Sequence, residues 1–184
     1  MTMDKERQKK MVVVGVCGSV AAVKVPELVR ELVRRDLNVV VALNSSARHT
    51  IAEPVLEWAS GNPVVTQLTG KMEHVKYFSV GGEAKLLLIC PATADTIGKI
   101  ANGIDDTPVT TMAAVALGSS VPIIVVPAMD ISMYYNPFLA ANVSKLKEAG
   151  VIFVEPRIAE NKAKLADEES IVDAVFTALA GGGK

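Results

Sequence analysis

The sequence predicts an α/β protein with a doubly wound, three-layer fold of the Rossmann-like or flavodoxin-like kind, built on a parallel sheet of about six strands. Short continuous apolar runs alternate with longer segments in which apolar residues recur at helical spacing, which is typical of strands joined by helical crossovers. Apolar residues make up 50% of the chain but aromatic residues only 4%. A core of Val, Ala, Leu and Ile is typical of a sheet that helices cover on both faces.

The length and charge of the chain narrow its class. Its 184 residues fit one domain spanning 1–184, with tails at 1–10 and 181–184 that we expect to be disordered. The net charge of −1 gives no basic surplus for binding nucleic acid or an anionic membrane. The charged leader has no apolar h-region, and no window reaches about 18 uninterrupted apolar residues, so we expect neither a signal peptide nor a transmembrane helix.

The cysteines and histidines give no metal-ligand pattern. Cys17 and Cys90 are isolated, and only two histidines accompany them. This spacing does not match any zinc site, so we expect no metal. An isolated pair of cysteines is typical of reduced, buried thiols, which favours a cytoplasmic protein.

Strand–helix units follow one another through the first half of the chain. After an apolar run from residue 11, Val25, Leu28 and Leu32 recur at helical spacing among charged residues. The next apolar run ends at Asn44, which begins a cluster of small polar residues suited to capping a helix. We therefore expect a strand at 11–16, a helix at 20–35, a strand at 37–43, a helix at 44–59 and a short extra strand at 64–68.

The second half continues this alternation after an irregular segment. Thr93 or Asp95 can cap a helix that Gly103 ends, and Pro108 begins a helix of small residues. Gly150 ends the next amphipathic helix. We expect an irregular segment at 69–83, strands at 85–90, 123–127 and 151–154, helices at 93–103, 108–117, 137–149 and 167–179, and a polar loop at 155–164.

Two strand-to-helix turns carry groups suited to an anion. In an open α/β sheet, ligands bind at the carboxyl ends of the strands. Gly18 would allow a close approach to the chain, and Ser19 adds a hydroxyl group where backbone N–H groups and a helix dipole favour an anion. The spacing fits neither the dinucleotide fingerprint nor a phosphate-binding loop with Gly-Lys-Ser. A plain tight turn explains Gly18 and Ser19 equally well, as capping alone explains Asn44 to Ser46.

A third strand end, Pro127 to Pro137, contains an acid, two methionines and two tyrosines. This composition suits a pocket for a flat aromatic ligand, although the same residues serve as core fillers. His74 lies alone in the irregular segment. A lone histidine is more often structural than catalytic, but its imidazole suits proton transfer near neutral pH.

Taken together, three stretches resemble the family of flavin-dependent cysteine decarboxylases, FMN proteins that include phosphopantothenoylcysteine decarboxylase. Their order and spacing match the family over roughly residues 11–175. The stretches are 15–24, 91–97 followed by Gly103 and Asp106, and 127–130 followed by Met133, Asn136 and Pro137.

The resemblance implies FMN as the cofactor, bound at the strand ends. It also implies homotrimers, in some members assembled into dodecamers, with the flavin sites where subunits meet and the helix 108–117 at the interface. The residues that would contact FMN are Gly18, Ser19, Val20, Asn44, Ser46, Pro91, Ala92, Thr93, Ala94, Asp95, Ala128 and Met129.

The reaction that the resemblance implies is the decarboxylation of 4'-phosphopantothenoylcysteine to 4'-phosphopantetheine in coenzyme A biosynthesis. FMN would oxidise the thiol-bearing carbon, carbon dioxide would leave, and the reduced flavin would return the electrons. His74, at the position of the family's active-site histidine, would act as base or electrostatic partner, and Asp130 would hold the substrate carboxylate or amide. Met133, Asn136 and Lys162 would line the substrate side.

Two positions depart from the family pattern. Asp130 stands where the family has Asn, and an ionised carboxylate accepts hydrogen bonds but cannot donate them. Residues 156–165 lack the lid cysteine of the bacterial and eukaryotic enzymes and instead contain Lys-Ala-Lys at 162–164, as in the archaeal form. Lys162, Lys164 and Arg157 would meet the substrate phosphate or lie in a solvated charged loop. An FMN-binding flavin reductase or electron-transfer protein, and a non-enzymatic member that binds another protein, are the alternatives.

Overall fold

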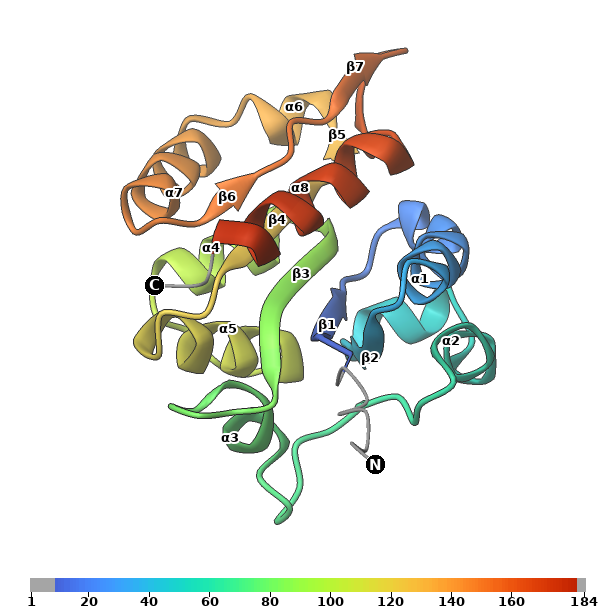
Figure 1. Ribbon diagram of the computed structural model, residues 1–184. Coiled ribbons are helices and arrows are strands. Elements are labelled where there is room, and N and C mark those ends of the chain that lie inside the picture. Colours follow the sequence, from blue (N-terminus) through green and yellow to red (C-terminus); the bar gives the residue numbers. More distant parts are fainter. Residues whose placement is uncertain (1–8, 182–184) are drawn as a thin grey trace, which may run out of the picture.

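A computed structural model describes residues 9–181 of the chain, and its centre is a parallel five-stranded sheet (Figure 1). All neighbouring strands pair in parallel, in the order β2-β1-β3-β4-β6. The predicted doubly wound fold is therefore confirmed. The strands are β1 (Met11–Val16), β2 (Asn38–Leu43), β3 (Ala84–Ala92), β4 (Ile123–Pro127) and β6 (Ile152–Phe153).

The sheet has five strands where about six were expected. The candidate strand at 64–68 makes only an isolated parallel bridge, between Ala42 and Val65. Val65 donates to the carbonyl of Val41 and accepts from the amide of Leu43, both at 2.8 Å. Pro63 has no amide hydrogen to donate to the ladder, so pairing on the side of the chain before Val65 is limited.

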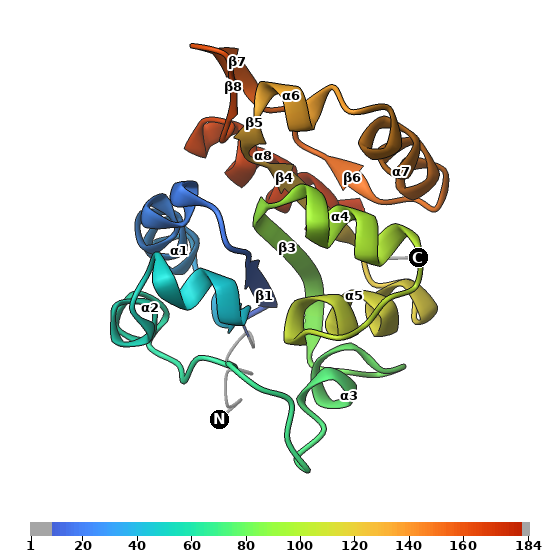
Figure 2. The same ribbon diagram turned by 180° about the vertical axis from the view of Figure 1, so that it is seen from behind.

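Helices cover both faces of the sheet. On one face, residues of α1 (Val25–Arg34), α2 (Glu53–Ser60) and α8 (Glu168–Gly181) pack against inward side chains such as Val12 and Val14. On the other face lie α3, α4, α5 and α7 (Figure 2). Their bounds are Glu73–Phe78, Ala94–Ala101, Pro108–Gly118 and Pro137–Glu148. No helix within residues 9–181 is long and apolar enough to cross a membrane.

Two helices that were expected to be continuous are each divided. The segment 20–35 starts with a 3-10 helix, Val20–Lys24, before α1, and the segment 44–59 starts with a 3-10 helix, Ser45–His49, before α2. A proline lies in the first turn of both α-helices. Its ring clashes with the carbonyl four residues earlier, so the α-helix cannot extend backwards through it.

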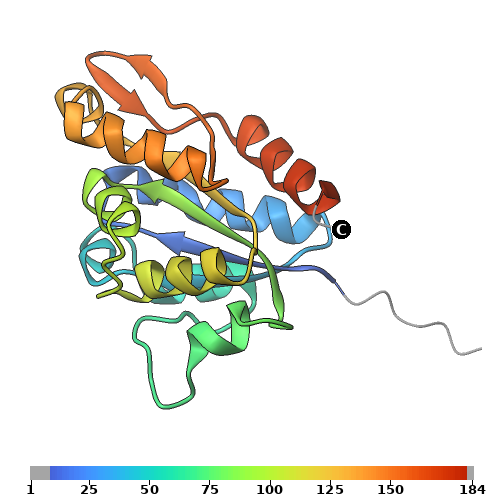
Figure 3. The same cartoon turned by 90° about the vertical axis from the view of Figure 1, so that its left-hand side faces the viewer.

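The segment 155–164 is not the polar loop that was expected. It forms β7 (Arg157–Ala159) and β8 (Lys162–Lys164), which join β5 (Met129–Asp130) in a small antiparallel sheet of order β5-β8-β7. Glu160 and Asn161 both have positive φ, at 51° and 55°, as a two-residue hairpin turn requires. This hairpin lies at the opposite end of the molecule from α3 (Figure 3).

Candidate functional site

The carboxyl ends of β1 and β3 form the topological switch point of the sheet. The chain continues from β1 into a helix on one face and from β3 into a helix on the other, which opens a crevice between the two turns. Backbone hydrogen bonds connect the predicted turns, from Cys17 N–H to the Pro91 carbonyl at 3.3 Å and from Ala128 N–H to the Ala92 carbonyl at 3.1 Å. The Ser19 hydroxyl donates to the Ala128 carbonyl at 3.2 Å. Three of the predicted motifs therefore meet at one place.

The first two predicted anion turns touch each other. A Cβ atom built on Gly18 would lie 2.6 Å from the Ser46 Oγ and 2.7 Å from its Cβ. Only glycine allows this approach, so Gly18 is required for the close contact with Ser46 as well as for the turn. Ser19 caps the 3-10 helix that follows, because its Oγ accepts from the Ala21 amide at 3.3 Å. Val20 is 80% exposed beside this turn.

Asn44 is buried at the same edge and is only partly satisfied. Its Nδ2 donates to the Cys17 sulfur at 3.8 Å, while its Oδ1 is buried and has no hydrogen-bond partner among residues 9–181. An unpaired buried acceptor is costly, so a ligand donor such as a hydroxyl group would be stabilised here. If the amide were turned over, Oδ1 would accept from the Cys17 thiol and the NH₂ group would be free for an anion.

The thiol of Cys17 stays protonated beside this amide. Burial raises its pKa from 9.0 to about 11, although a hydrogen bond with the Thr96 side chain lowers the pKa in part. Burial likewise raises the pKa of the second thiol, Cys90. Because a thiolate is the reactive form of cysteine, neither residue fits a nucleophile.

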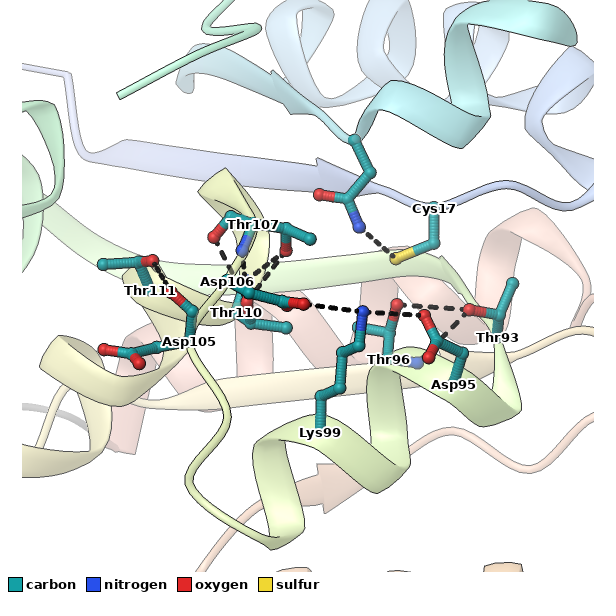
Figure 4. A network of polar contacts seen from close by, with 11 residues as sticks. Cys17, Thr93, Asp95, Thr96, Lys99, Asp105, Asp106, Thr107, Thr110 and Thr111 are labelled. Carbon is teal, nitrogen blue, oxygen red and sulfur yellow. Dashed lines mark hydrogen bonds and ion pairs between the residues drawn. The ribbon is translucent and has the colours of Figure 1, made fainter. Parts of the chain in front are cut away.

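The turn after β3 is organised by threonines and an ion-pair chain (Figure 4). Thr93 caps α4: its Oγ1 accepts from the Thr96 amide at 3.4 Å and donates to the Thr96 hydroxyl at 3.1 Å. Lys99 lies between Asp95 at 3.4 Å and Asp106 at 3.1 Å. The Asp95 carboxylate is therefore held by Lys99, and Pro91 and Ala92 are buried at the end of β3.

A pocket of about 400 Å³ opens between the turn after β1 and the hairpin. The polar and charged side chains around it include Asp130 and three lysines. Six residues of the predicted site line it, namely Ser19, Val20, Ala128, Met129, Asp130 and Lys162. Lys164, which the sequence suggested together with Lys162 for the substrate phosphate, also lines it, whereas Ala21, Lys24, Ala163 and Leu165 were not predicted.

Asp130 has a structural contact of its own. Its Oδ1 accepts a hydrogen bond from the Ser132 backbone amide at 2.8 Å, which caps the short helix α6 (Ile131–Tyr134). The backbone of Asp130 pairs with Lys162 in the small sheet. Asn accepts such a capping bond as well as Asp does, so this contact does not require a carboxylate.

Three of the five residues predicted for catalysis or substrate binding do not line the pocket. Asn136 caps α7, with its Oδ1 accepting from the Phe138 amide at 2.8 Å, and Met133 lies exposed on α6. His74 lies on α3, which packs against α5 on the other side of the molecule from the hairpin (Figures 1 and 3). The side chain of His74 is half-buried, and its Nδ1 has no hydrogen-bond partner among the described residues.

An open α/β fold of this strand order, with small polar turns at its switch point and a pocket beside the turn after β1, is the architecture of a flavodoxin-like cofactor-binding protein. The flavoprotein family model matches residues 1–180. The chain belongs to this family and, within it, to the flavin-dependent cysteine decarboxylases.

Similar sequences include the bifunctional coenzyme A biosynthesis protein CoaBC of Thermococcus kodakarensis, 45% identical over 97% of this chain and 44% of that protein. CoaBC of Methanocaldococcus jannaschii is 36% identical over 95% of this chain and 42% of that protein. The chain therefore spans less than half the length of these two relatives. A probable phosphopantothenoylcysteine decarboxylase of Streptococcus mutans is 31% identical over 80% of this chain and 83% of that protein.

Solved structures with the same fold include two that are named as decarboxylases. The FMN-dependent cysteine decarboxylase SpaF superposes with a TM-score of 0.80 at 30% identity, covering 96% of this chain and 98% of that chain. A mutant PPC decarboxylase complexed with pantothenoylaminoethenethiol superposes with a TM-score of 0.72 at 26% identity, covering 92% and 98%.

Proposed function

We propose that the protein is an FMN-dependent decarboxylase that converts 4'-phosphopantothenoylcysteine to 4'-phosphopantetheine in coenzyme A biosynthesis. The printed names of the relatives support the substrate. The observation that carries the proposal is the meeting of the turns at Gly18, Ser46 and Ala128 beside a pocket that contains Asp130 and Lys162. A cofactor site and a substrate pocket are then adjacent.

The residues at the switch point fit FMN. Gly18 and Ser46 lie in contact at the turn before a helix, where a phosphate group can approach the backbone closely. Asn44 has an unpaired buried oxygen that can accept a hydrogen bond from a hydroxyl group of the cofactor. Thr93 and the strand end before it would bound the cofactor on the side of α4. When bound, FMN supplies the oxidation and re-reduction that make loss of carbon dioxide from the substrate feasible.

The protein's own groups would bind and orient the substrate. Ala128 and Met129 provide apolar surface between the cofactor turns and the pocket. Lys162 provides positive charge for an anionic substrate, and the second oxygen of Asp130 can accept from a donor on the substrate. The hairpin that contains Lys162 forms one side of the pocket.

We further propose that the protein works as a homotrimer, alone or assembled into a dodecamer. Large apolar side chains are exposed, among them Val20 at the pocket at 80%, and Tyr135 at 66% and Phe138 at 81% in the segment after β5. Exposed apolar surface of this kind supports subunit contacts. His74 lies away from the pocket of its own chain, so in the trimer it would serve as base or electrostatic partner in the site of a neighbouring copy.

The helix α5 needs no neighbouring subunit to bury its small residues. Val109, Met112, Ala113 and Ala116 pack against the sheet of the same chain. If α5 lies at a subunit interface, it would contact the neighbouring subunit through the side that faces away from the sheet. We also propose a cytoplasmic location, which the two free, buried thiols support.

The test of function compares the substrate with redox partners. Purified protein is loaded with FMN, and stopped-flow absorbance follows the flavin after mixing with 4'-phosphopantothenoylcysteine, with reduced ferredoxin or with a nicotinamide cofactor. We expect turnover with the cysteine substrate and release of carbon dioxide. Rapid flavin reduction by ferredoxin or nicotinamide, with no release of carbon dioxide, would favour an electron-transfer protein. A protein that refuses FMN but remains a trimer would favour a binding role.

A further inference from the structure

We propose that Lys24, together with Lys162 and Lys164, forms a subsite for the terminal phosphate group of the substrate, between the segment after β1 and the hairpin. The identity of the molecule that carries this phosphate rests on the proposed function. The geometry by itself points to a phosphate monoester. Lys24 ends the first of the three stretches that resemble the family, but the resemblance assigns it no role in the site, and the pocket places it there.

The three lysines come from two separate segments and line the same pocket. Lys24 is the last residue of the 3-10 helix that follows the first anion turn, and Lys162 and Lys164 begin and end β8. Residues two apart on a strand share a face, so Lys162 and Lys164 lie on the same side of β8. Ala163 between them is 1% exposed. The small sheet therefore places the two lysines on one face of β8, and both line the pocket together with Lys24.

The charges of this cluster are incompletely compensated. Lys164 pairs with Glu160 at 2.7 Å, but the side-chain ammonium groups of Lys24 and Lys162 have no ion pair or hydrogen bond with any residue of the described range 9–181. Asp130 is the carboxylate that lines the pocket, and one of its oxygens caps α6. The positive charge therefore exceeds the negative charge at the pocket. Because ammonium groups bind phosphate as point charges, two free ones favour a dianion over a monoanionic carboxylate.

The cluster is separate from the turns assigned to the flavin phosphate. Gly18, Asn44 and Ser46 do not line the pocket, whereas the next residues along the chain, Ser19 and Val20, do. Ser19 and Val20 thus lie between the turns assigned to the flavin phosphate and the lysine cluster. A phosphate at the lysines would belong to a molecule that enters from the hairpin side, as a substrate with its phosphate at one end and its cysteine at the flavin would.

The test compares two substrates that differ only in the phosphate. FMN-loaded wild type, Lys24→Gln and Lys162→Gln are assayed with 4'-phosphopantothenoylcysteine and with pantothenoylcysteine. Lys145→Gln, at an exposed position on α7 outside the pocket, is the control. Each pocket variant should reduce the preference in kcat/KM for the phosphorylated substrate about tenfold, as expected for one charge-assisted contact, and the control should not. Unchanged preference in both pocket variants would overturn the subsite.

A binding measurement separates this inference from the proposed function. Calorimetry gives the Kd of 4'-phosphopantetheine and of pantetheine for the same FMN-loaded proteins. Tighter binding of the phosphorylated compound, with the difference reduced in Lys24→Gln, supports the subsite even if the wild type decarboxylates neither substrate. In that case the proposed function fails and the subsite stands. Loss of bound FMN from Lys24→Gln would overturn the subsite, because Lys24 would then belong to the flavin site.

Discussion

A methyl group on Gly18 would lie 2.6 Å from the hydroxyl oxygen of Ser46, and its nearest backbone neighbour would be the Ser46 carbonyl carbon at 3.2 Å. The two residues come from the turns after β1 and β2, which are adjacent strands. This contact brings together the backbone amides and hydroxyl groups that we assign to the FMN phosphate. A change at Gly18 therefore tests the cofactor site directly.

We expect Gly18→Ala to lower the affinity for FMN at least about tenfold, because the turn must shift to make room for the methyl group. The measurement is FMN binding by fluorescence quenching, with circular dichroism as a check on the fold. Gly118→Ala is the matched control, since a Cβ there meets nothing within 4 Å. Equal FMN affinity in Gly18→Ala and wild type would contradict the assignment.

A mixed assembly tests the proposal that His74 acts on the site of a neighbouring copy. Gly18→Ala subunits bind FMN more weakly but contain His74, whereas His74→Asn subunits bind FMN normally but lack the histidine, and the assay keeps free FMN at a concentration that loads mainly the His74→Asn subunits. Each homomer should lose most of its decarboxylase activity. Co-expression with two different tags and tandem purification should give mixed assemblies that regain a measurable part of it. If the mixed assemblies remain as inactive as the homomers, His74 does not act between subunits.

The Asp130→Asn variant separates the two roles of Asp130. The cap to the Ser132 amide at 2.8 Å should survive in Asn, so we expect the same melting temperature as wild type. Decarboxylation should be retained or increased, because Asn can also donate to the substrate carboxylate. Asp130→Ala removes the cap, at a cost of about 1 kcal/mol, and serves as the comparison. Complete loss of activity in Asp130→Asn would mean that the carboxylate itself is required.

The buried thiol of Cys17 predicts a loss of stability in alkali. Its pKa is 9.0 in its ordinary state and about 11 in the folded protein, because burial disfavours the thiolate. Between these values the unfolded chain has lost the proton that the folded protein retains, so the free energy of unfolding falls as pH rises. The contribution of Cys17 is fully present below pH 9 and amounts to roughly 3 kcal/mol, lost as the pH rises from 9 through 11.

Urea unfolding at several pH values from 8 to about 11 measures this effect. Cys17→Ala should show a shallower decline than wild type, because one of the groups with a raised pKa is gone. Parallel declines in the two proteins would show that Cys17 ionises in the folded state as easily as in the unfolded one. In the folded protein at neutral pH, the thiol should also resist iodoacetamide.

Local pattern was enough to predict the strands and the edge that contains the site. Runs such as Val12 to Val14 are apolar without interruption because helices cover both faces of the sheet, and this signal lies within a few residues. The parallel arrangement then places the turns after β1, β2, β3 and β4 at one edge. Pattern alone left Gly18 and Ser46 open to a tight turn and to helix capping, and only the family resemblance assigned them with Ala128 to one cofactor site.

Contacts between distant segments could not be predicted in this way. The β7–β8 hairpin has Glu160 and Asn161 at its turn rather than Asn-Gly, and its strands have three residues each, so it resembles a loop in sequence. Lys24 enters the pocket only because that hairpin folds back towards the segment after β1. The position of His74 on α3, away from the pocket, also depends on packing against α5.

The release of carbon dioxide from carboxyl-labelled 4'-phosphopantothenoylcysteine tests the proposed activity most directly. The protein is freed of flavin, divided, and assayed with and without added FMN, with mass spectrometry of the remaining product. We predict labelled carbon dioxide and 4'-phosphopantetheine in equal amounts, only in the sample with FMN. Full flavin loading with the substrate unchanged and no labelled carbon dioxide would contradict the assignment of this protein as a phosphopantothenoylcysteine decarboxylase.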